Sequence, residues 1–171
     1  VIGNDISWKL DNENCLNVQG TGELEENPWS NFGDNIKEIV IGEGITSVGD
    51  YLYKGYSNVK NLKLPDSLEK IGSDTFYGLG IEQLIIPKNV QVIGDWGFCS
   101  CSLETVIFES DTVLKKIGQF AFANNYNLKS ISLPSSVEYI GTWAFAADGK
   151  VGGIKEINYT GANLKYLGQY V

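Results

Sequence analysis

The chain has 171 residues, with 13 lysines against 21 acidic residues, so its formal charge at neutral pH is −8. Hydrophobic residues make up 43% and charged residues 20%, as in one folded globular domain. The sequence contains no histidine and no arginine, which excludes imidazole catalysis and histidine-containing metal sites and argues against nucleic-acid binding.

The ends of the chain also lead to an expectation. The sequence begins at Val1 and contains no methionine, so we expect it to be a piece of a longer protein. No run of residues approaches the ~20 apolar positions of a membrane span, and no signal-peptide pattern is present. Any export signal or anchor is therefore expected outside these residues.

Residues 1–35 predict a β-hairpin. Apolar residues alternate over 6–10, a polar turn cluster follows over 11–14, and alternation resumes over 16–18. We interpret the segment as an N-terminal cap for the exposed apolar end of the repeats that follow. The cap carries most of the net charge, since it has seven acidic residues and one lysine, whereas residues 36–171 have 14 and 12.

From residue 36 onward, one pattern recurs at intervals of 22 to 26 residues. Its copies start at Ile36, Val59, Ile81, Leu103, Leu128 and Ile154. In the second copy, Leu62 and Leu64 alternate as in a short strand, and Pro65 ends that strand. After a further apolar pair, Gly72 permits a turn, and Phe76 is predicted to fill the interior.

Each copy predicts one coil of a solenoid. A single coil cannot bury its own apolar faces, so the coils must stack, strand on strand, about 4.8 Å apart. We therefore predict a strand-rich repeat solenoid of right-handed stacked coils with short helical turns. Five full coils and a partial sixth occupy residues 36–171, behind the hairpin cap of residues 1–35.

The repeat resembles the BspA-type leucine-rich repeat, whose consensus is Leu-x-x-Ile-x-Leu-Pro-x-x-Leu-x-x-Ile-Gly-x-x-Ala-Phe-x-x-Cys. Residues 128–145 (LKSISLPSSVEYIGTWAF) follow this consensus almost position by position. The resemblance implies a curved leucine-rich-repeat solenoid of secreted or surface-anchored bacterial proteins that act in adhesion and in host or matrix binding. It implies neither catalytic activity nor a cofactor.

A column two residues after each coil glycine is the first candidate binding surface. It consists of Tyr51, Asp74, Trp96, Phe120, Trp143 and Tyr170. Stacked coils would align its aromatic members in a row, which suits protein partners or sugar rings because aromatic groups bury a large area at low entropic cost. The alternative is that the rings pack on one another and shield the turn edge of the coils.

The outward positions of the first strand form the second candidate surface. One column holds Val40, Lys63, Ile85, Ile107, Ser132 and Asn158, and the adjacent column holds Glu38, Asn61, Gln83, Thr105, Ser130 and Glu156. Val40, Ile85 and Ile107 would make an exposed apolar spot, which can mark an interface. The alternative is ordinary β-branched filling of a sheet surface.

The remaining reactive groups give no catalytic or metal site. Cys101 stands at the cysteine of the family consensus, so we expect a buried filler, and Cys15 and Cys99 cannot complete a metal site. Carboxylate pairs such as Glu109 with Asp111 are interpreted as solvated charge, because a solenoid offers no deep cleft between them.

The sequence thus predicts a non-catalytic binding module of a bacterial secreted or surface protein, with no cofactor and no metal. We expect it to mediate adhesion to a host or matrix protein. A carbohydrate-binding module that uses the aromatic column, and a structural spacer for a domain outside this chain, are the alternatives.

Overall fold

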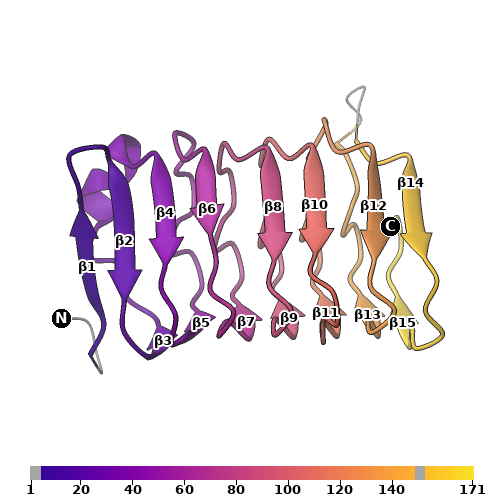
Figure 1. The fold of residues 1–171 in the computed structure, drawn as a ribbon. Coiled ribbons are helices and arrows are strands. Elements are labelled where there is room, and N and C mark those ends of the chain that lie inside the picture. Colours follow the sequence, from indigo (N-terminus) through magenta and orange to yellow (C-terminus); the bar gives the residue numbers. More distant parts are fainter. Residues whose placement is uncertain (1–4, 149–152) are drawn as a thin grey trace.

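The structure, a computed structural model, describes residues 5–148 and 153–171. It is a stack of coils that runs from the N-terminal hairpin to the last strands of the chain (Figure 1). Strands on one side of the stack form what we call the strand face: β1 (Ser7–Leu10), β2 (Cys15–Gln19), β4 (Glu38–Ile41), β6 (Asn61–Lys63), β8 (Gln83–Ile86), β10 (Thr105–Phe108), β12 (Ser130–Leu133) and β14 (Glu156–Tyr159). The predicted solenoid is confirmed.

Shorter strands line a second side of the stack and form one continuous sheet. They are β3 (Gly22–Leu24), β5 (Ile45–Val48), β7 (Lys70–Ile71), β9 (Val92–Ile93), β11 (Lys116–Ile117), β13 (Tyr139–Ile140) and β15 (Tyr166–Leu167). All seven pair in parallel in coil order. Turns connect the two sides, and η1 (Ser30–Asn35), a 3-10 helix, is the one helix among the described residues.

The strand face, in contrast, is divided into three hydrogen-bonded groups. Its strands pair in the orders β1-β2-β4-β6, β8-β10 and β12-β14, so pairing stops between β6 and β8 and again between β10 and β12. Within each group the predicted columns align, since Val40 pairs with Lys63, Ile85 with Ile107, and Ser132 with Asn158.

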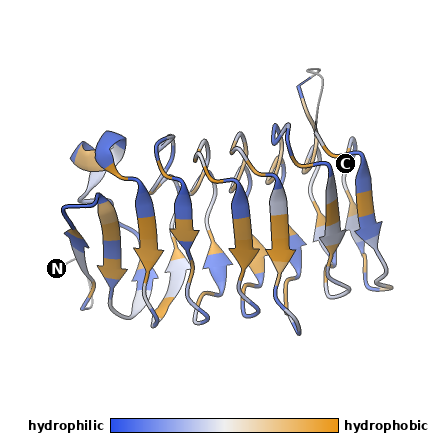
Figure 2. Cartoon of the chain, turned by 45° about the horizontal axis from the view of Figure 1, so that its top comes forward, coloured by the Kyte–Doolittle hydropathy of each residue, from blue (hydrophilic) through white to orange (hydrophobic). Residues whose placement is uncertain are grey.

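Aromatic rings stack through the centre of the coils. Tyr53, Phe76, Phe98 and Phe122 are fully or almost fully buried, and the ring centroids of successive members lie 5.4, 5.2 and 5.6 Å apart. Aliphatic side chains from both strands of each coil surround this inner stack, and Figure 2 shows the resulting apolar stretches in the strands. The predicted role of Phe76 as an interior plug is confirmed.

The N-terminal segment forms the predicted hairpin and also takes part in the coil stack. β1 and β2 pair antiparallel, whereas β2 pairs in parallel with β4, and β3 with β5. Trp29 stacks on Tyr53 at 5.4 Å and so continues the inner stack. The role of the hairpin as a cap and the domain boundary at residue 35 stay predictions.

Candidate binding surfaces

The column after the coil glycines has an unusual backbone. Tyr51, Trp96, Phe120, Trp143 and Tyr170, which we call the aromatic row, have φ angles between +55° and +63°. Non-glycine residues rarely adopt this left-handed region, so the surrounding structure must hold them there. Hydrogen bonds to the next coil do so: the N–H of Trp96 donates to the carbonyl of Gln119 at 2.8 Å, and that of Phe120 to Thr142 at 3.1 Å.

Four rings of the aromatic row stack on one another. The centroids of Trp96 and Phe120 lie 4.0 Å apart, those of Phe120 and Trp143 6.3 Å, and those of Trp143 and Tyr170 4.3 Å, with interplanar angles of 21° or less. Trp143 is nevertheless 37% exposed and Tyr170 65%. The rings therefore cover each other's faces and present their edges to solvent, so the row and the mutual packing anticipated as its alternative are both present.

Asp74 interrupts the aromatic column. Two residues that the sequence pattern did not single out, Lys54 and Tyr77, pack beside it. Lys54 pairs with Asp74 at 2.6 Å, and its ammonium group lies 5.2 Å from the ring centroid of Tyr51 and 5.0 Å from that of Tyr77. Tyr77 in turn lies 6.5 Å from Trp96. The hydrogen bond to Asp74 raises the pKa of Lys54. The same ion pair holds the ammonium group near both tyrosine rings.

A hollow of about 380 Å³ lies beside the C-terminal half of the aromatic row. Its lining comprises Trp96, Phe120, Trp143, Ala123, Ala146, Ala147, Asn124 and Asp148. The position three residues after each member of the column, Asp74 included, explains where it forms. Lys54 and Tyr77 stand there in the first coils, Cys99 in the next, and the alanines Ala123 and Ala146 in the later ones. This change of size was a sequence signal that could have located the hollow.

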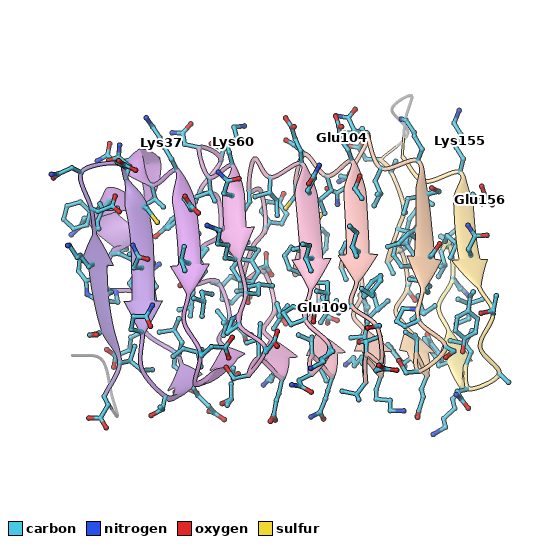
Figure 3. The ribbon with its side chains drawn as sticks, in the orientation of Figure 1. Lys37, Lys60, Glu104, Glu109, Lys155 and Glu156 are labelled. Atoms are coloured by element: carbon cyan, nitrogen blue, oxygen red, sulfur yellow. The ribbon has the colours of Figure 1, made fainter. Side chains whose placement is uncertain are left out.

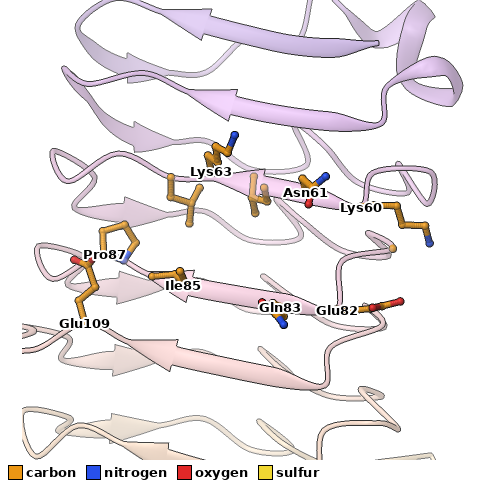
Figure 4. Close-up of a pocket in the computed structure, with 11 residues that line it drawn as sticks. Lys60, Asn61, Lys63, Glu82, Gln83, Ile85, Pro87 and Glu109 are labelled. Carbon is orange, nitrogen blue, oxygen red and sulfur yellow. The ribbon is translucent and has the colours of Figure 1, made fainter. Parts of the chain in front are cut away.

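The strand face exposes the second candidate surface. Ile85 is 54% and Ile107 50% exposed, whereas Val40 is half-buried. Lys63 is not free, because it pairs with Glu38 at 2.8 Å. A groove of about 780 Å³ runs along the break between β6 and β8, with Lys60 and Lys63 on one side and Glu82, Gln83 and Ile85 on the other (Figure 4).

The cysteines occupy structural positions. Cys101 is buried, its thiol lies 3.2 Å from the carbonyl oxygen of Phe76, and burial raises its pKa to about 12. Cys99 is buried and Cys15 half-buried, and desolvation raises the pKa of both.

The described residues include neither a cluster of metal ligands nor a membrane-spanning helix. Within residues 5–148 and 153–171, no three His, Cys, Asp or Glu side chains are grouped as a metal site would need. The same part of the chain includes no helix of the length and apolarity that a bilayer crossing requires.

Comparison of the fold with solved structures finds bacterial leucine-rich repeat proteins. The pneumococcal vaccine antigen PcpA matches with a TM-score of 0.64 and 21% identity over 92% of this chain and 49% of that one. A leucine-rich repeat protein from Bacteroides ovatus matches with a TM-score of 0.57 and 20% identity, and the match covers 98% of this chain and 55% of that one. The T. pallidum leucine-rich repeat protein TpLRR matches with a TM-score of 0.61 and 18% identity, and the match covers 90% of this chain and 83% of that one. The chain thus spans about half the length of the first two.

Sequence comparison identifies the family. No curated protein matches the chain. The model described as the BspA type leucine-rich repeat region matches residues 22–152 in six copies, which is well over half of the sequence. The chain therefore belongs to the BspA-type leucine-rich repeat family.

Proposed function

We propose that the chain is a non-catalytic protein-binding module of a bacterial secreted or surface protein, and that the aromatic row is its docking surface. The observation that carries the proposal is the apolar hollow beside the exposed ring edges of the row. An apolar side chain of a partner could enter the hollow while the ring edges surround it, an arrangement typical of the anchor residues of protein interfaces.

The stacking within the row favours a protein over a carbohydrate partner. A sugar ring packs its flat CH face on an open aromatic face. In the row, Phe120 has a ring on either side of it, Trp96 at 4.0 Å and Trp143 at 6.3 Å, so its faces are not free for a sugar. The exposed edges and the alanine-lined hollow remain available to side chains of a protein.

The names of similar structures support an extracellular setting. One of them is a pneumococcal vaccine antigen and another is a leucine-rich cell surface protein from Faecalibacterium prausnitzii. We extend this setting to the present chain, and we propose host or matrix proteins as the class of partner.

Binding assays on a defined panel test the proposal. The chain is measured against immobilised fibronectin, fibrinogen, laminin and collagen, and against a glycan array. The row variant carries Trp96→Asn with Trp143→Asn, because asparagine tolerates the left-handed backbone at these positions. The control variant carries Ile85→Ser with Ile107→Ser, which removes the other exposed apolar pair.

We expect saturable binding to at least one protein of the panel, a loss of at least about tenfold in affinity for the row variant, and unchanged affinity for the control. Melting curves followed by circular dichroism establish that both variants fold. The proposal is wrong if no protein of the panel binds, if only glycans bind, or if the row variant binds as tightly as the unaltered chain.

A further inference from the structure

A column of residues runs along the sheet of shorter strands, one from each strand after β3. It holds Ser47, Lys70, Val92, Lys116, Tyr139 and Tyr166, which strand pairing places side by side in coil order. The residue that follows each of the first five is buried, so by the alternation of a strand the column points outward. Figure 3 shows the labelled charges Lys60, Glu104 and Lys155 at the opposite edge of the solenoid from these strands, so the column is a surface apart from the strand face.

The last two members of the column are tyrosines that stack on each other. The ring centroids of Tyr139 and Tyr166 lie 4.5 Å apart, with an interplanar angle of 10°. The ammonium group of Lys116 lies 5.3 Å from the ring centroid of Tyr139, so this ring has a neighbour in the coil before it and one in the coil after it. Neither tyrosine is buried, and Tyr166 is 45% exposed. The two phenols are thus held together while they remain open to solvent.

The other neighbouring tyrosines are arranged differently. Tyr53 and Tyr56 also contact each other, but Tyr53 is fully buried, and the two rings are nearly perpendicular at 6.1 Å. Tyr51 and Tyr77 are joined through the ammonium group of Lys54 rather than ring to ring. Close stacking together with access from solvent therefore distinguishes the pair on β13 and β15.

The composition of the chain directs oxidation toward its aromatic rings. Methionine and accessible cysteine are common targets of oxidants, but the chain contains no methionine. Cys99 and Cys101 are buried, and Cys15 is half-buried. The accessible targets are therefore mainly aromatic side chains, and among these a phenol gives a radical that can couple with a second phenol.

We propose that Tyr139 and Tyr166 are a site of oxidative cross-linking, at which hydrogen peroxide and a haem peroxidase join two coils through a dityrosine bond. Each phenol gives up one electron and its hydroxyl proton to the activated peroxidase. The two radicals join through one ring carbon beside each oxygen, and the hydrogen on each of these carbons then moves to the oxygen. The two electrons and two protons reduce one hydrogen peroxide to two water molecules, so one C–C bond forms and both phenols are retained.

The stacked geometry favours this bond over a bond between two chains. Groups that are held in contact react far faster than the same groups free in dilute solution. Because neither ring is buried, each can turn until a carbon beside its oxygen faces the other ring. β13 and β15 pair over two residues only, so the bond adds a covalent link where the ladder is short. We expect it to fasten the sixth coil to the fifth, whether or not the aromatic row is a docking surface.

Peroxidase oxidation of tyrosine variants tests the proposal. The chain is treated at low micromolar concentration with a haem peroxidase and one equivalent of hydrogen peroxide. Dityrosine is measured by its fluorescence and by mass spectrometry of the digested protein. We expect one main product, in which the peptides of Tyr139 and Tyr166 are joined with the loss of two hydrogens. Tyr139→Phe and Tyr166→Phe each keep a stacked ring, and each is expected to lower the dityrosine yield at least about fivefold.

Tyr51→Phe is the matched control, since Tyr51 is 57% exposed but lies beside Lys54 rather than against another tyrosine ring. We expect it to leave the dityrosine yield unchanged. The proposal is overturned if the main dityrosine product joins other tyrosines or separate chains. It is also overturned if the variants Tyr139→Phe and Tyr166→Phe form as much dityrosine as the unaltered chain.

Hydrogen exchange of the oxidised chain tests whether the bond fastens the coils. The N–H of Gly168 donates to the carbonyl of Ile140 at 2.8 Å, and that of Tyr166 to Glu138 at 3.1 Å. These bonds open when the sixth coil separates from the fifth. We expect the cross-link to slow exchange of both amides at least about tenfold, and the same treatment of Tyr139→Phe to have no such effect. Unchanged exchange in the cross-linked chain would overturn the fastening role.

Discussion

Trp96 and Phe120 stack with their ring centroids 4.0 Å apart, although the core rings of the same two coils, Phe98 and Phe122, are 5.6 Å apart. The rings at the rim therefore lean toward each other more closely than the coil spacing in the core. Phe120 and Trp143 are correspondingly 6.3 Å apart, and the apolar hollow is lined by these same three rings. The uneven spacing of Trp96, Phe120 and Trp143 thus shapes the surface that we propose for docking.

The left-handed backbone of the aromatic row predicts a strong dependence on the shape of the substituted side chain. Tyr51 has a φ of +63° and is 57% exposed, so removing its ring loses little packing. Tyr51→Asn is expected to change the free energy of unfolding by less than about 1 kcal/mol, because asparagine tolerates this region. Tyr51→Val is expected to lower it by about 1–3 kcal/mol, because a β-branched residue does not. Urea denaturation of the two variants measures the difference, and equal values would contradict the explanation.

The inner stack predicts a large cost for a truncation at its centre. Phe98 is fully buried between Phe76 and Phe122. Phe98→Ala is expected to lower the free energy of unfolding by about 3–5 kcal/mol, since it removes a ring and leaves a cavity. Phe98→Leu keeps most of the volume and serves as the control, with a clearly smaller loss expected. Calorimetric melting of the two variants would contradict this role if the alanine variant melted within a degree or two of the unaltered chain.

Asn125 stands where the family consensus has cysteine. Its side-chain hydrogen bonds make a contribution to the free energy of unfolding that differs in kind from the packing of Phe98. Its side-chain amide donates to the carbonyls of Phe98 at 2.9 Å and Phe122 at 2.8 Å, and its oxygen accepts the N–H of Leu103 at 3.3 Å. Asn125→Ala leaves these buried groups without a partner, so we expect a loss of about 2–3 kcal/mol. Chemical denaturation measures the change, and a loss below about 0.5 kcal/mol would show that the hydrogen bonds contribute little.

The stability of the last coils is predicted to depend on pH through Glu138. Its carboxylate accepts hydrogen bonds from Lys165 and Lys115, which lower its pKa below the ordinary value of 4.5. Because the pKa is lower in the folded chain, the carboxylate stabilises the fold above pH 4.5, and this contribution is lost as the pH falls through the folded pKa. We expect Glu138→Gln to lower the melting temperature at pH 7 and to converge with the unaltered chain near pH 3. A difference that stayed constant with pH would contradict this role.

The repeat columns made most of the fold predictable, because a residue that recurs at the coil spacing must stand beside its counterpart. Val40, Lys63, Ile85 and Ile107 lie on the strand face for this reason. The coil built by β2 and β3 was not predicted, since residues 15–24 lack most of the repeat columns. They join the stack through strand pairing and through Leu16, Val18 and Leu24, which are buried in the core.

Other features of the candidate surfaces depend on contacts between coils that no column encodes. The placement of Lys54 between Tyr51 and Tyr77 follows from its ion pair with Asp74. The breaks in the strand face also could not be predicted, because the apolar pattern of β8 does not differ from that of its neighbours.

The most direct test of the proposed docking surface is hydroxyl-radical footprinting of the chain, alone and bound to the panel protein that binds it most tightly, because oxidation reports on side chains individually. The proposal predicts that Trp143 and Phe120 are oxidised several-fold more slowly in the complex, while Ile85 and Ile107 react as in the free chain. Protection of Ile85 and Ile107 with unchanged oxidation of Trp143 and Phe120 would contradict it, because the partner would then cover the strand face and leave the aromatic row open.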